Sequence, residues 1–211
     1  MTTQGSALAR HQPAITLADA AIPAFGRDQS ATWVRAAMLV IGGAALTALA
    51  AQLAWQSPWS PVPYTGQTAA VLLVGTALGW RLGLASMALY VLVGVAGLPV
   101  FAGQAHGIEK LLGYTGGYLV GFMVAAALVG RLAELGWDRS PLRAAGLMVI
   151  GNLVIYAIGV PVLAITLEMA LGDALWAGAL GFVLWDAFKI VVAAGLLPLA
   201  WRAVGSGGAR R

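Results

Sequence analysis

The sequence contains no cysteine and very little charge. Its 211 residues include 12 Lys or Arg, 8 Asp or Glu and 2 His. The missing cysteines exclude disulfides, thiolate metal sites and thiol catalysis, and two histidines disfavour a histidine-rich metal centre. Only 9% of the residues are charged, against roughly 25% in an average soluble domain. These absences exclude a soluble fold, and we expect neither a metal site nor a resident cofactor.

Catalytic and nucleotide-binding motifs are also missing. The sequence has no HExxH, no G-x-x-x-x-G-K-[ST] and no G-x-S-x-G, which are the signatures of zinc peptidases, phosphate-binding loops and serine hydrolases. An intramembrane serine protease would need a histidine inside an apolar run, but His11 and His106 lie in polar segments. We therefore expect no catalytic residues and no enzyme. Any ATP hydrolysis must belong to partner subunits.

Long apolar runs occupy most of the chain. Hydrophobic residues make up 60% of the sequence, and a transmembrane helix needs about 20 of them. Breaks containing Gly, Pro or charge separate six apolar runs, at residues 36–54, 68–78, 84–98, 118–132, 144–167 and 176–201. The pattern predicts an all-α integral membrane protein with six transmembrane helices. Its membrane domain spans residues 32–203, between an N-terminal tail, 1–31, and a C-terminal tail, 204–211, that are expected to be flexible.

Positive charge is distributed unevenly between the two sides of the predicted membrane domain. Ten of the twelve Lys and Arg residues fall on the side that holds both termini. The other two are Lys110, in the opposite loop set, and Lys189, inside the last run. Because Lys and Arg favour the cytoplasmic side, both termini are predicted to be cytoplasmic, in a protein of the inner membrane. The net charge of +4 forms no basic stripe, so no nucleic acid partner is expected.

Asp186 and Lys189 are the strongest candidates for a binding site. Both lie 10 to 13 residues into the last apolar run, which places them about 15 to 20 Å into the membrane at ~1.5 Å per residue. A charge at that depth is costly against lipid. Their i, i+3 spacing puts them on one helix face. They predict the polar floor of a ligand cavity; the alternative is a mutually neutralising pair that only packs inside the bundle.

Two segments on the non-cytoplasmic side are too apolar for ordinary solvated loops. They are Ser60–Gln67, reading SPVPYTGQ, and Gly97–Gln104, reading GLPVFAGQ. Pro and Gly make such segments stiff and tightly turned, which suits lids over a cavity. We predict two structured lid loops and place Gln67 at the binding site. Re-entrant connectors buried against helices are the alternative.

A glycine pair and a tyrosine open the fourth run, in the segment Tyr114–Phe122 reading YTGGYLVGF. Gly116 and Gly117 allow a ligand to approach the backbone closely, and Tyr118 adds an amphipathic wall. A helix start that packs closely through its glycines is an equally good interpretation. The first run carries another small-residue feature, Ala44 and Ala48 at four-residue spacing. Such faces allow tight helix contact in membranes, so we predict a docking surface for a partner subunit there.

Taken in order, four of these motifs resemble the BioY family, the biotin-binding membrane subunits of energy-coupling-factor transporters. The motifs are PVPYTGQ at 61–67, GLPVFAG at 97–103, TGGYLVGF at 115–122 and DAFK at 186–189. The resemblance extends from about residue 36 to 200. It implies a six-helix protein that captures biotin and works with a transmembrane coupling subunit and two cytoplasmic ATPases.

The resemblance also implies roles for individual residues. The last-helix D-x-x-K motif and the G-G-Y segment contribute to the biotin site in the family, and these roles correspond to Asp186, Lys189 and Tyr118. The small-residue face of the first helix, here Ala44 and Ala48, docks on the coupling subunit. Biotin is mostly apolar, with ureido N–H groups, a ureido carbonyl and a carboxylate. A carboxylate can accept from the ureido and a lysine can donate to the carbonyl or the carboxylate, so its orientation stays open.

Three other functions compete with biotin capture. A protein of the same fold could capture another vitamin. A non-transporting structural membrane protein could use Asp186 and Lys189 only as an internal salt bridge. A small intramembrane enzyme is the third alternative, which the missing nucleophile and base disfavour.

Overall fold

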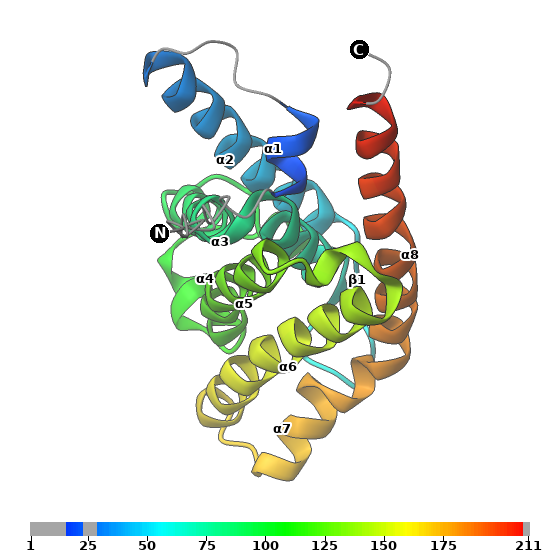
Figure 1. Ribbon diagram of the computed structural model, residues 1–211. Helices are drawn as coiled ribbons and strands as arrows, with labels where there is room; N and C mark the ends of the chain where they lie inside the picture. The colour runs from blue at the N-terminus through cyan, green and yellow to red at the C-terminus, as the bar shows by residue number, and fades with distance from the viewer. Residues whose placement is uncertain (1–15, 23–28, 209–211) are drawn as a thin grey trace, which may run out of the picture.

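The computed structural model describes residues 16–22 and 29–208, and its secondary structure is almost entirely helical (Figure 1). The helices are α1 Leu17–Ala21, α2 Gln29–Gln52, α3 Gln67–Val95, α4 Ile108–Leu112, α5 Gly116–Glu134, α6 Pro141–Thr166, α7 Leu171–Gly178 and α8 Val183–Gly208. Three single-turn 3₁₀ helices, η1 Ala102–Gln104, η2 Trp137–Arg139 and η3 Leu180–Phe182, join some of them. Two short antiparallel strands, β1 Ala54–Trp55 and β2 Tyr64–Thr65, complete the described chain.

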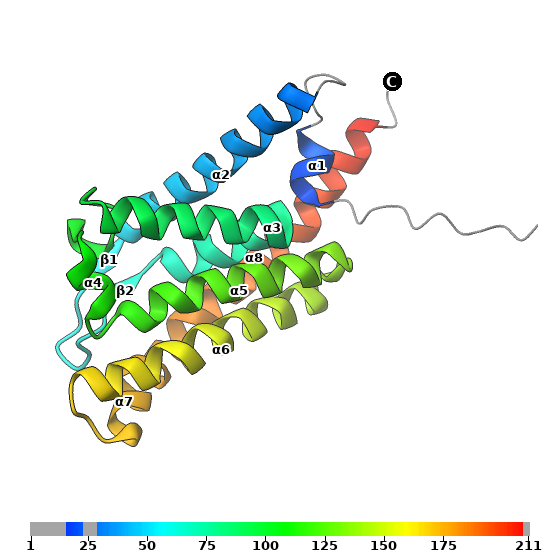
Figure 2. The ribbon, with the colours of Figure 1, turned by 90° about the vertical axis from the view of Figure 1, so that its left-hand side faces the viewer.

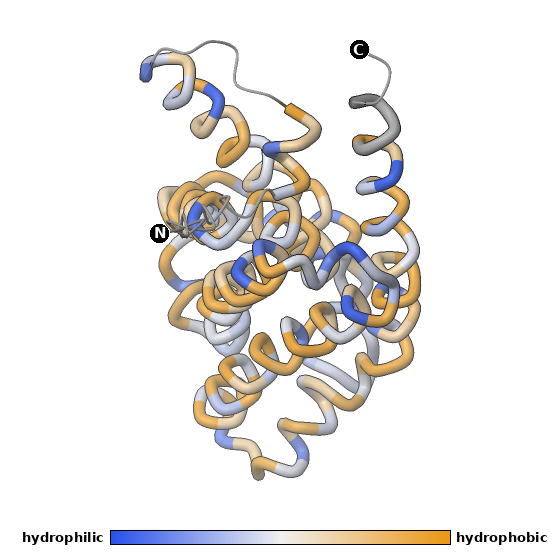
Figure 3. Tube along the Cα trace, in the orientation of Figure 1, coloured by the Kyte–Doolittle hydropathy of each residue, from blue (hydrophilic) through white to orange (hydrophobic). Residues whose placement is uncertain are grey.

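The long helices form a bundle whose two ends differ. Figure 2 shows β1, β2, α4 and α7 gathered at one end, and α1 with the last turns of α8 at the other. Apolar residues cover the helices along their length, and hydrophilic residues concentrate at the turn between α5 and α6 and near the start of α2 (Figure 3). We call the end with β1, β2, α4 and α7 the lid end, because it contains both predicted lid segments.

Five helical stretches in the described residues are long and apolar enough to cross a membrane. They are α2, α3, α5, α6 and the continuous stretch Leu171–Val204. These stretches confirm an all-α, multi-pass membrane protein. Each of the six predicted apolar runs lies largely within one of them, and α3 contains both the second and the third.

The two runs within α3 are separated by a reversal at Gly79. Its φ of 80° and ψ of 174° are not helical, and a positive φ of this kind is readily available only to glycine. The halves fold back against each other, since a methyl group placed on Gly83 would lie 2.8 Å from the Gly75 Cα atom. Helix α5 packs tightly on this reversal, where Gly130 approaches the backbone of Gly79 and Gly75. Small residues at these contacts allow the helix backbones to approach closely.

Part of the small-residue face of α2 packs inside the chain. Ala44 is only 6% exposed and belongs to the hydrophobic core, and Ala48 packs partly buried against it. Beside Ala44, Gly43 faces α3 so closely that a methyl group there would overlap the side chain of Ser86. Small residues therefore mediate a close contact between α2 and α3 of the same chain. Docking of a partner subunit at Ala44 and Ala48 stays a prediction.

The N-terminal tail predicted to be flexible contains a docked helix, α1. The side chain of Thr16 accepts a hydrogen bond from the Asp19 backbone N–H, and the Asp19 side chain accepts one from the Thr16 backbone, which closes a capping box. Arg35 of α2 pairs with the Asp19 carboxylate at 3.0 Å and donates to the carbonyl groups of Ala18 and Ile22. Local composition did not predict this helix, because the contacts that hold it come from Arg35, a residue of another helix. The remainder of the predicted tail, residues 1–15 and 23–28, lies outside the described residues.

Candidate functional site

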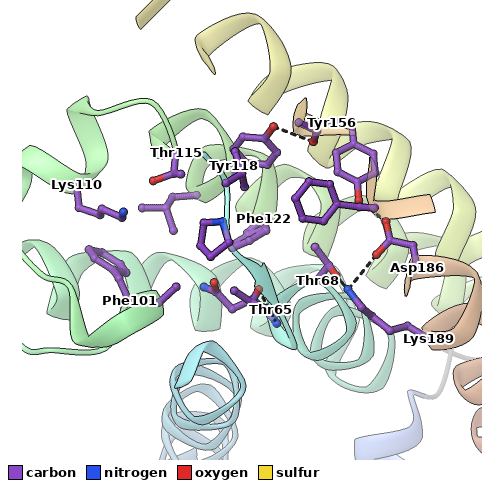
Figure 4. Close-up of a pocket in the computed structure, with 17 residues that line it drawn as sticks. Thr65, Thr68, Phe101, Lys110, Thr115, Tyr118, Phe122, Tyr156, Asp186 and Lys189 are labelled. Atoms are coloured by element: carbon purple, nitrogen blue, oxygen red, sulfur yellow. Dashed lines mark hydrogen bonds and ion pairs between the residues drawn. The ribbon is translucent and has the colours of Figure 1, made fainter. Parts of the chain in front are cut away.

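A cavity at the lid end of the bundle brings together residues from six helices, α3 to α8, and both lids. Its volume is about 60 Å³, enough for a few water molecules. The exposed area of the walls is mostly apolar, with Asp186 and Lys189 at one end and Lys110 at the other (Figure 4). The lining residues are Val62, Pro63, Thr65, Gln67, Thr68, Phe101, Ala102, Lys110, Thr115, Tyr118, Leu119, Phe122, Tyr156, Gly178, Phe182, Asp186 and Lys189.

One end of the cavity is a polar cluster around Asp186, at the start of α8. The Lys189 ammonium group donates to Asp186 Oδ1 at 2.9 Å and to Thr68 Oγ1 of α3 at 2.6 Å. The hydroxyl of Tyr156, from α6, donates to the other carboxylate oxygen. Asp186 is only 5% exposed, so a charge buried at this depth needs these partners. The i, i+3 spacing read from the sequence therefore corresponds to a real ion pair that faces the cavity.

Residues from three helices meet in this cluster. Two of these residues, Thr68 and Tyr156, were not predicted as site residues. Thr68 lies at the start of α3 and Tyr156 lies in the middle of α6, far from α8 in the sequence. Figure 4 shows both side chains directed toward the Asp186–Lys189 pair. Tyr156 lies in an apolar run, where it signals neither a ligand nor a core position by itself. Only the packing of α6 against α8 brings its hydroxyl to the carboxylate.

The first lid is fastened to the segment that leads into α8. Tyr64 of β2 stacks on Phe182 with ring centroids 4.2 Å apart and donates its hydroxyl to the Gly181 carbonyl at 2.8 Å. Earlier in the same lid, the Ser60 hydroxyl donates to the Ala177 carbonyl at 2.7 Å. These contacts hold the lid across the cavity beside Asp186. The predicted lid 60–67 is therefore a structured element.

The second lid packs on the other half of α3. Phe101, only 1% exposed, lies against Gly94 and contacts the Tyr90 ring edge-on at a centroid distance of 5.4 Å. Gln67 donates from its amide nitrogen to the Tyr90 hydroxyl at 2.7 Å, and Tyr90 donates in turn to the Val100 carbonyl at 3.2 Å. Gln67 thus lines the cavity, as its predicted role requires, and also connects the first lid to the second.

Tyr118 and the glycine pair before it occupy different environments. The Tyr118 ring lines the cavity, while its hydroxyl donates to the Gly178 carbonyl at 2.9 Å and so ties α5 to α7. Gly116 approaches the backbone of Leu111, and Gly117 approaches Val162 and the Ile158 carbonyl of α6. Neither glycine is among the lining residues. The structure therefore brings Tyr118 to the cavity, whereas Gly116 and Gly117 serve the close packing of helices.

Lys110, from α4, marks the end of the cavity opposite Asp186 (Figure 4). Its ammonium group lies 5.3 Å from the centre of the Tyr114 ring, within range of a cation–π contact. Partial burial lowers the pKa of Lys110 below its ordinary value. The sequence did contain a signal for this residue, since it is the single Lys or Arg that the predicted topology assigns to the non-cytoplasmic loops.

The groups that line the cavity suit an elongated ligand with polar groups at both ends, and the space of about 60 Å³ must widen to admit one. Asp186 accepts hydrogen bonds at one end, Lys110 offers a positive charge at the other, and aromatic rings lie between them. Few polar groups in a mostly apolar enclosure are typical of small-molecule sites. Fold and site together define a multi-pass membrane protein with a cavity whose lining suits a small amphipathic ligand.

Comparison with known proteins agrees with this class and identifies the family. A crystal structure described as the S-component for biotin from an ECF-type ABC transporter superposes with a TM-score of 0.75 and 20% sequence identity, covering 84% of this chain and 95% of that one. This likeness shows that the two share a fold. The BioY family profile matches residues 21–206, so the chain belongs to the BioY family.

Individual relatives are similar over most of their length. The biotin transporter BioY of Thermotoga maritima is 42% identical over 149 residues, which are 70% of this chain and 86% of the relative. The biotin transporter BioY2 of Lactococcus lactis subsp. cremoris is 35% identical over 155 residues, or 73% of this chain and 83% of the relative. The predicted resemblance to the family is thereby confirmed.

Proposed function

We propose that this protein captures biotin as the substrate-specific subunit of an energy-coupling-factor transporter in the inner membrane. The observation that carries the proposal is the cavity with the Asp186 cluster at one end and Lys110 at the other. Membership of the BioY family and the names of the relatives support biotin as the ligand. Transport rather than catalysis is the function of the relatives by name.

Biotin fits this cavity in one orientation better than in the other. Its ureido ring carries two N–H donors and a carbonyl, and these match an end that holds a carboxylate acceptor, Asp186, beside an ammonium donor, Lys189. Its carboxylate, at the end of a flexible aliphatic chain, matches Lys110, because charge-assisted hydrogen bonds to a carboxylate are strong. The reverse orientation would place two carboxylates together at Asp186. The ureido ring therefore lies toward α8 and the carboxylate toward α4.

The protein crosses the membrane six times, with both termini in the cytoplasm. The reversal at Gly79 divides α3 into two crossings, each shorter than the roughly 20 residues of an average span. Arg81 lies directly after this reversal and Arg131 and Arg139 flank the turn between α5 and α6, as expected on a cytoplasmic side. Lid segments 60–67 and 97–104 then close the cavity from the outside.

The protein is proposed to work with partner subunits, as the family resemblance implies. The chain contains no phosphate-binding loop, so a transmembrane coupling subunit and two cytoplasmic ATPases supply the energy. The small residues Ala44 and Ala48 of α2 are proposed to dock on the coupling subunit; Ala44 is 6% exposed and Ala48 is partly buried in this structure.

Titration of the purified protein with biotin tests the proposal. A nearly enclosed cavity with charged groups at both ends should give a Kd of about 1 nM, or ~12 kcal/mol. Competition by a panel of labelled vitamins separates biotin from another vitamin. No heat with biotin, together with binding of a different vitamin, would replace the proposed ligand. No binding of any vitamin would favour the structural alternative, in which Asp186 and Lys189 only neutralise each other.

A further inference from the structure

Tyr156 separates two hollows of very different size. Its side chain lines the site cavity of about 60 Å³ and also a groove of about 600 Å³ between α6 and α8. Asp186 borders both spaces as well. The groove is otherwise lined almost entirely by aliphatic side chains of α6, α7 and α8. The hydrogen-bonded side chains of Tyr156 and Asp186 therefore separate the small cavity from the larger groove.

Asn152 lies one helical turn before Tyr156 and faces the same groove. It is only 7% exposed, and its Oδ1 has no hydrogen-bond partner among the described residues. A buried amide oxygen without a donor costs about 1–3 kcal/mol, and the membrane interior contains no water to satisfy it. A donor that reached Asn152 Oδ1 in another state of the protein would recover this cost.

The hydroxyl of Tyr156 is the donor best placed to do so. Residues four apart share one helix face, and helical side chains lean toward the N-terminal turn, so the Tyr156 ring passes over the turn that holds Asn152. Rotation of this ring toward the groove would exchange one hydrogen bond for another, from Asp186 to Asn152. The same rotation would free one oxygen of Asp186 and enlarge the cavity, because the ring moves from the smaller space into the larger one.

We propose that Tyr156 is a gate whose hydroxyl moves from Asp186 to Asn152 when the ligand enters. A ligand N–H group takes the vacated Asp186 oxygen, which is the step that rests on the proposed function. Every polar group then keeps a partner in both states except Asn152, which is unsatisfied only while the cavity is empty. Asn152 is a positioning residue, since it acts on the ligand through Tyr156.

A double-mutant cycle in the purified full-length protein tests the gate. Asn152→Leu replaces the amide by an apolar side chain of similar size, and biotin affinity is measured by titration calorimetry. We expect about tenfold weaker binding, because Tyr156 loses its acceptor in the bound state. The melting temperature of the ligand-free protein should stay the same or rise, because an unsatisfied polar group is removed. A purely structural role would lower the melting temperature.

The Tyr156→Phe background isolates the mechanism. Phenylalanine has no hydroxyl to transfer, so adding Asn152→Leu to Tyr156→Phe should change biotin affinity by less than about twofold. Leu142→Ala, at an 85% exposed position of α6 that lines neither the cavity nor the groove, is the control and should leave affinity unchanged.

Two results would overturn the gate while the proposed function stands. Equal losses of affinity from Asn152→Leu in both backgrounds would show that Asn152 acts without Tyr156. A lower ligand-free melting temperature with unchanged affinity would show a structural role. Absence of biotin binding by the unsubstituted protein, in contrast, would contradict the proposed function itself and the gate with it.

Discussion

Two buried carboxylates, Asp186 at the lid end and Asp138 at the opposite end, have contrasting surroundings. Asp186 is 5% exposed, is paired with the Lys189 ammonium group, and borders a cavity. Asp138, in η2, has no exposed surface and accepts a hydrogen bond from the Trp201 indole N–H at 2.6 Å. Its other oxygen has no partner among the described residues. The neighbouring Arg139 lies over the Trp201 ring at 4.6 Å.

The difference shows what distinguishes a ligand-binding carboxylate from a buried carboxylate that only stabilises the packing of the helices. Asp186 is held by a lysine and a tyrosine, whose side chains can exchange partners, next to a space that a ligand can enter. Asp138 is held by a rigid indole that joins the turn between α5 and α6 to the last turns of α8. Burial of a carboxylate does not by itself indicate ligand binding. A movable set of partners beside a cavity does.

The largest expected effect contrasts these two positions directly. Asp186→Asn should weaken biotin binding by at least ~2 kcal/mol, or about 30-fold, since it removes the charge that Lys189 and the ligand N–H groups require. Lys189→Ala should have a similar effect. Asp138→Asn should change affinity by less than about threefold, because the amide oxygen still accepts from Trp201. Calorimetric affinities measured with melting temperatures on the same preparations check this contrast, and equal losses at Asp186 and Asp138 would remove it.

A smaller effect is expected at Lys110, the other end of the cavity. Lys110→Met should weaken biotin binding by about tenfold, or ~1.4 kcal/mol, while the exposed neighbour Glu109 provides the control Glu109→Gln. Burial lowers the pKa of Lys110, and only the protonated form attracts the ligand carboxylate. Affinity should therefore fall as the pH rises through this lowered pKa.

Replacing Lys110 by arginine gives a sharper test, because arginine stays charged throughout the pH range in which Lys110 loses its proton. Lys110→Arg should keep its affinity constant at alkaline pH, where that of the unsubstituted protein declines. Identical pH profiles for the two proteins would show that Lys110 does not bind the carboxylate.

The smallest effect concerns the pH dependence of stability at Asp138. Burial raises the pKa of Asp138, and the Trp201 hydrogen bond opposes this shift only in part. A folded-state pKa above the unfolded value means that the folded protein binds the proton more tightly. The stabilisation is complete below the ordinary carboxyl pKa and is lost as the pH rises through the raised value.

Asp138→Asn cannot titrate and should flatten this dependence. Melting temperatures of both proteins between about pH 4 and pH 7, the range just above an ordinary aspartate pKa of about 3.9, measure the difference. We expect a flatter curve for Asp138→Asn over this range, and parallel curves for the two proteins would contradict the raised pKa of Asp138.

The sequence predicted some residues of the candidate site and not others, and this difference has a physical reason. Asp186 and Lys189 stand out because a charge inside an apolar run is costly wherever the helix packs. Thr68 and Tyr156 carry no such penalty, so nothing local separates them from other polar residues in membrane helices. Their place beside Asp186 results from the packing of α3 and α6 against α8.

Small residues show a second limit of prediction from sequence: they indicate a close contact but do not identify the group on the other side. Ala44 and Gly117 both mark close helix contacts, as their size suggests, but size does not say what lies on the other side. The structure places α3 against Gly43, the neighbour of Ala44, and α6 against Gly117. The docking of a partner subunit at Ala44 and Ala48 stays a prediction.

The sequence by itself determined the membrane class, the helical runs, the lid segments and the family, because hydropathy and motif order depend on residues that are near each other in the chain. Tertiary structure alone decided which helix faces meet. It closed the cavity between Asp186 and Lys110, brought Tyr156 to the carboxylate, and docked α1 through Arg35. These contacts join residues far apart in sequence, and their energies exist only once the helices have packed.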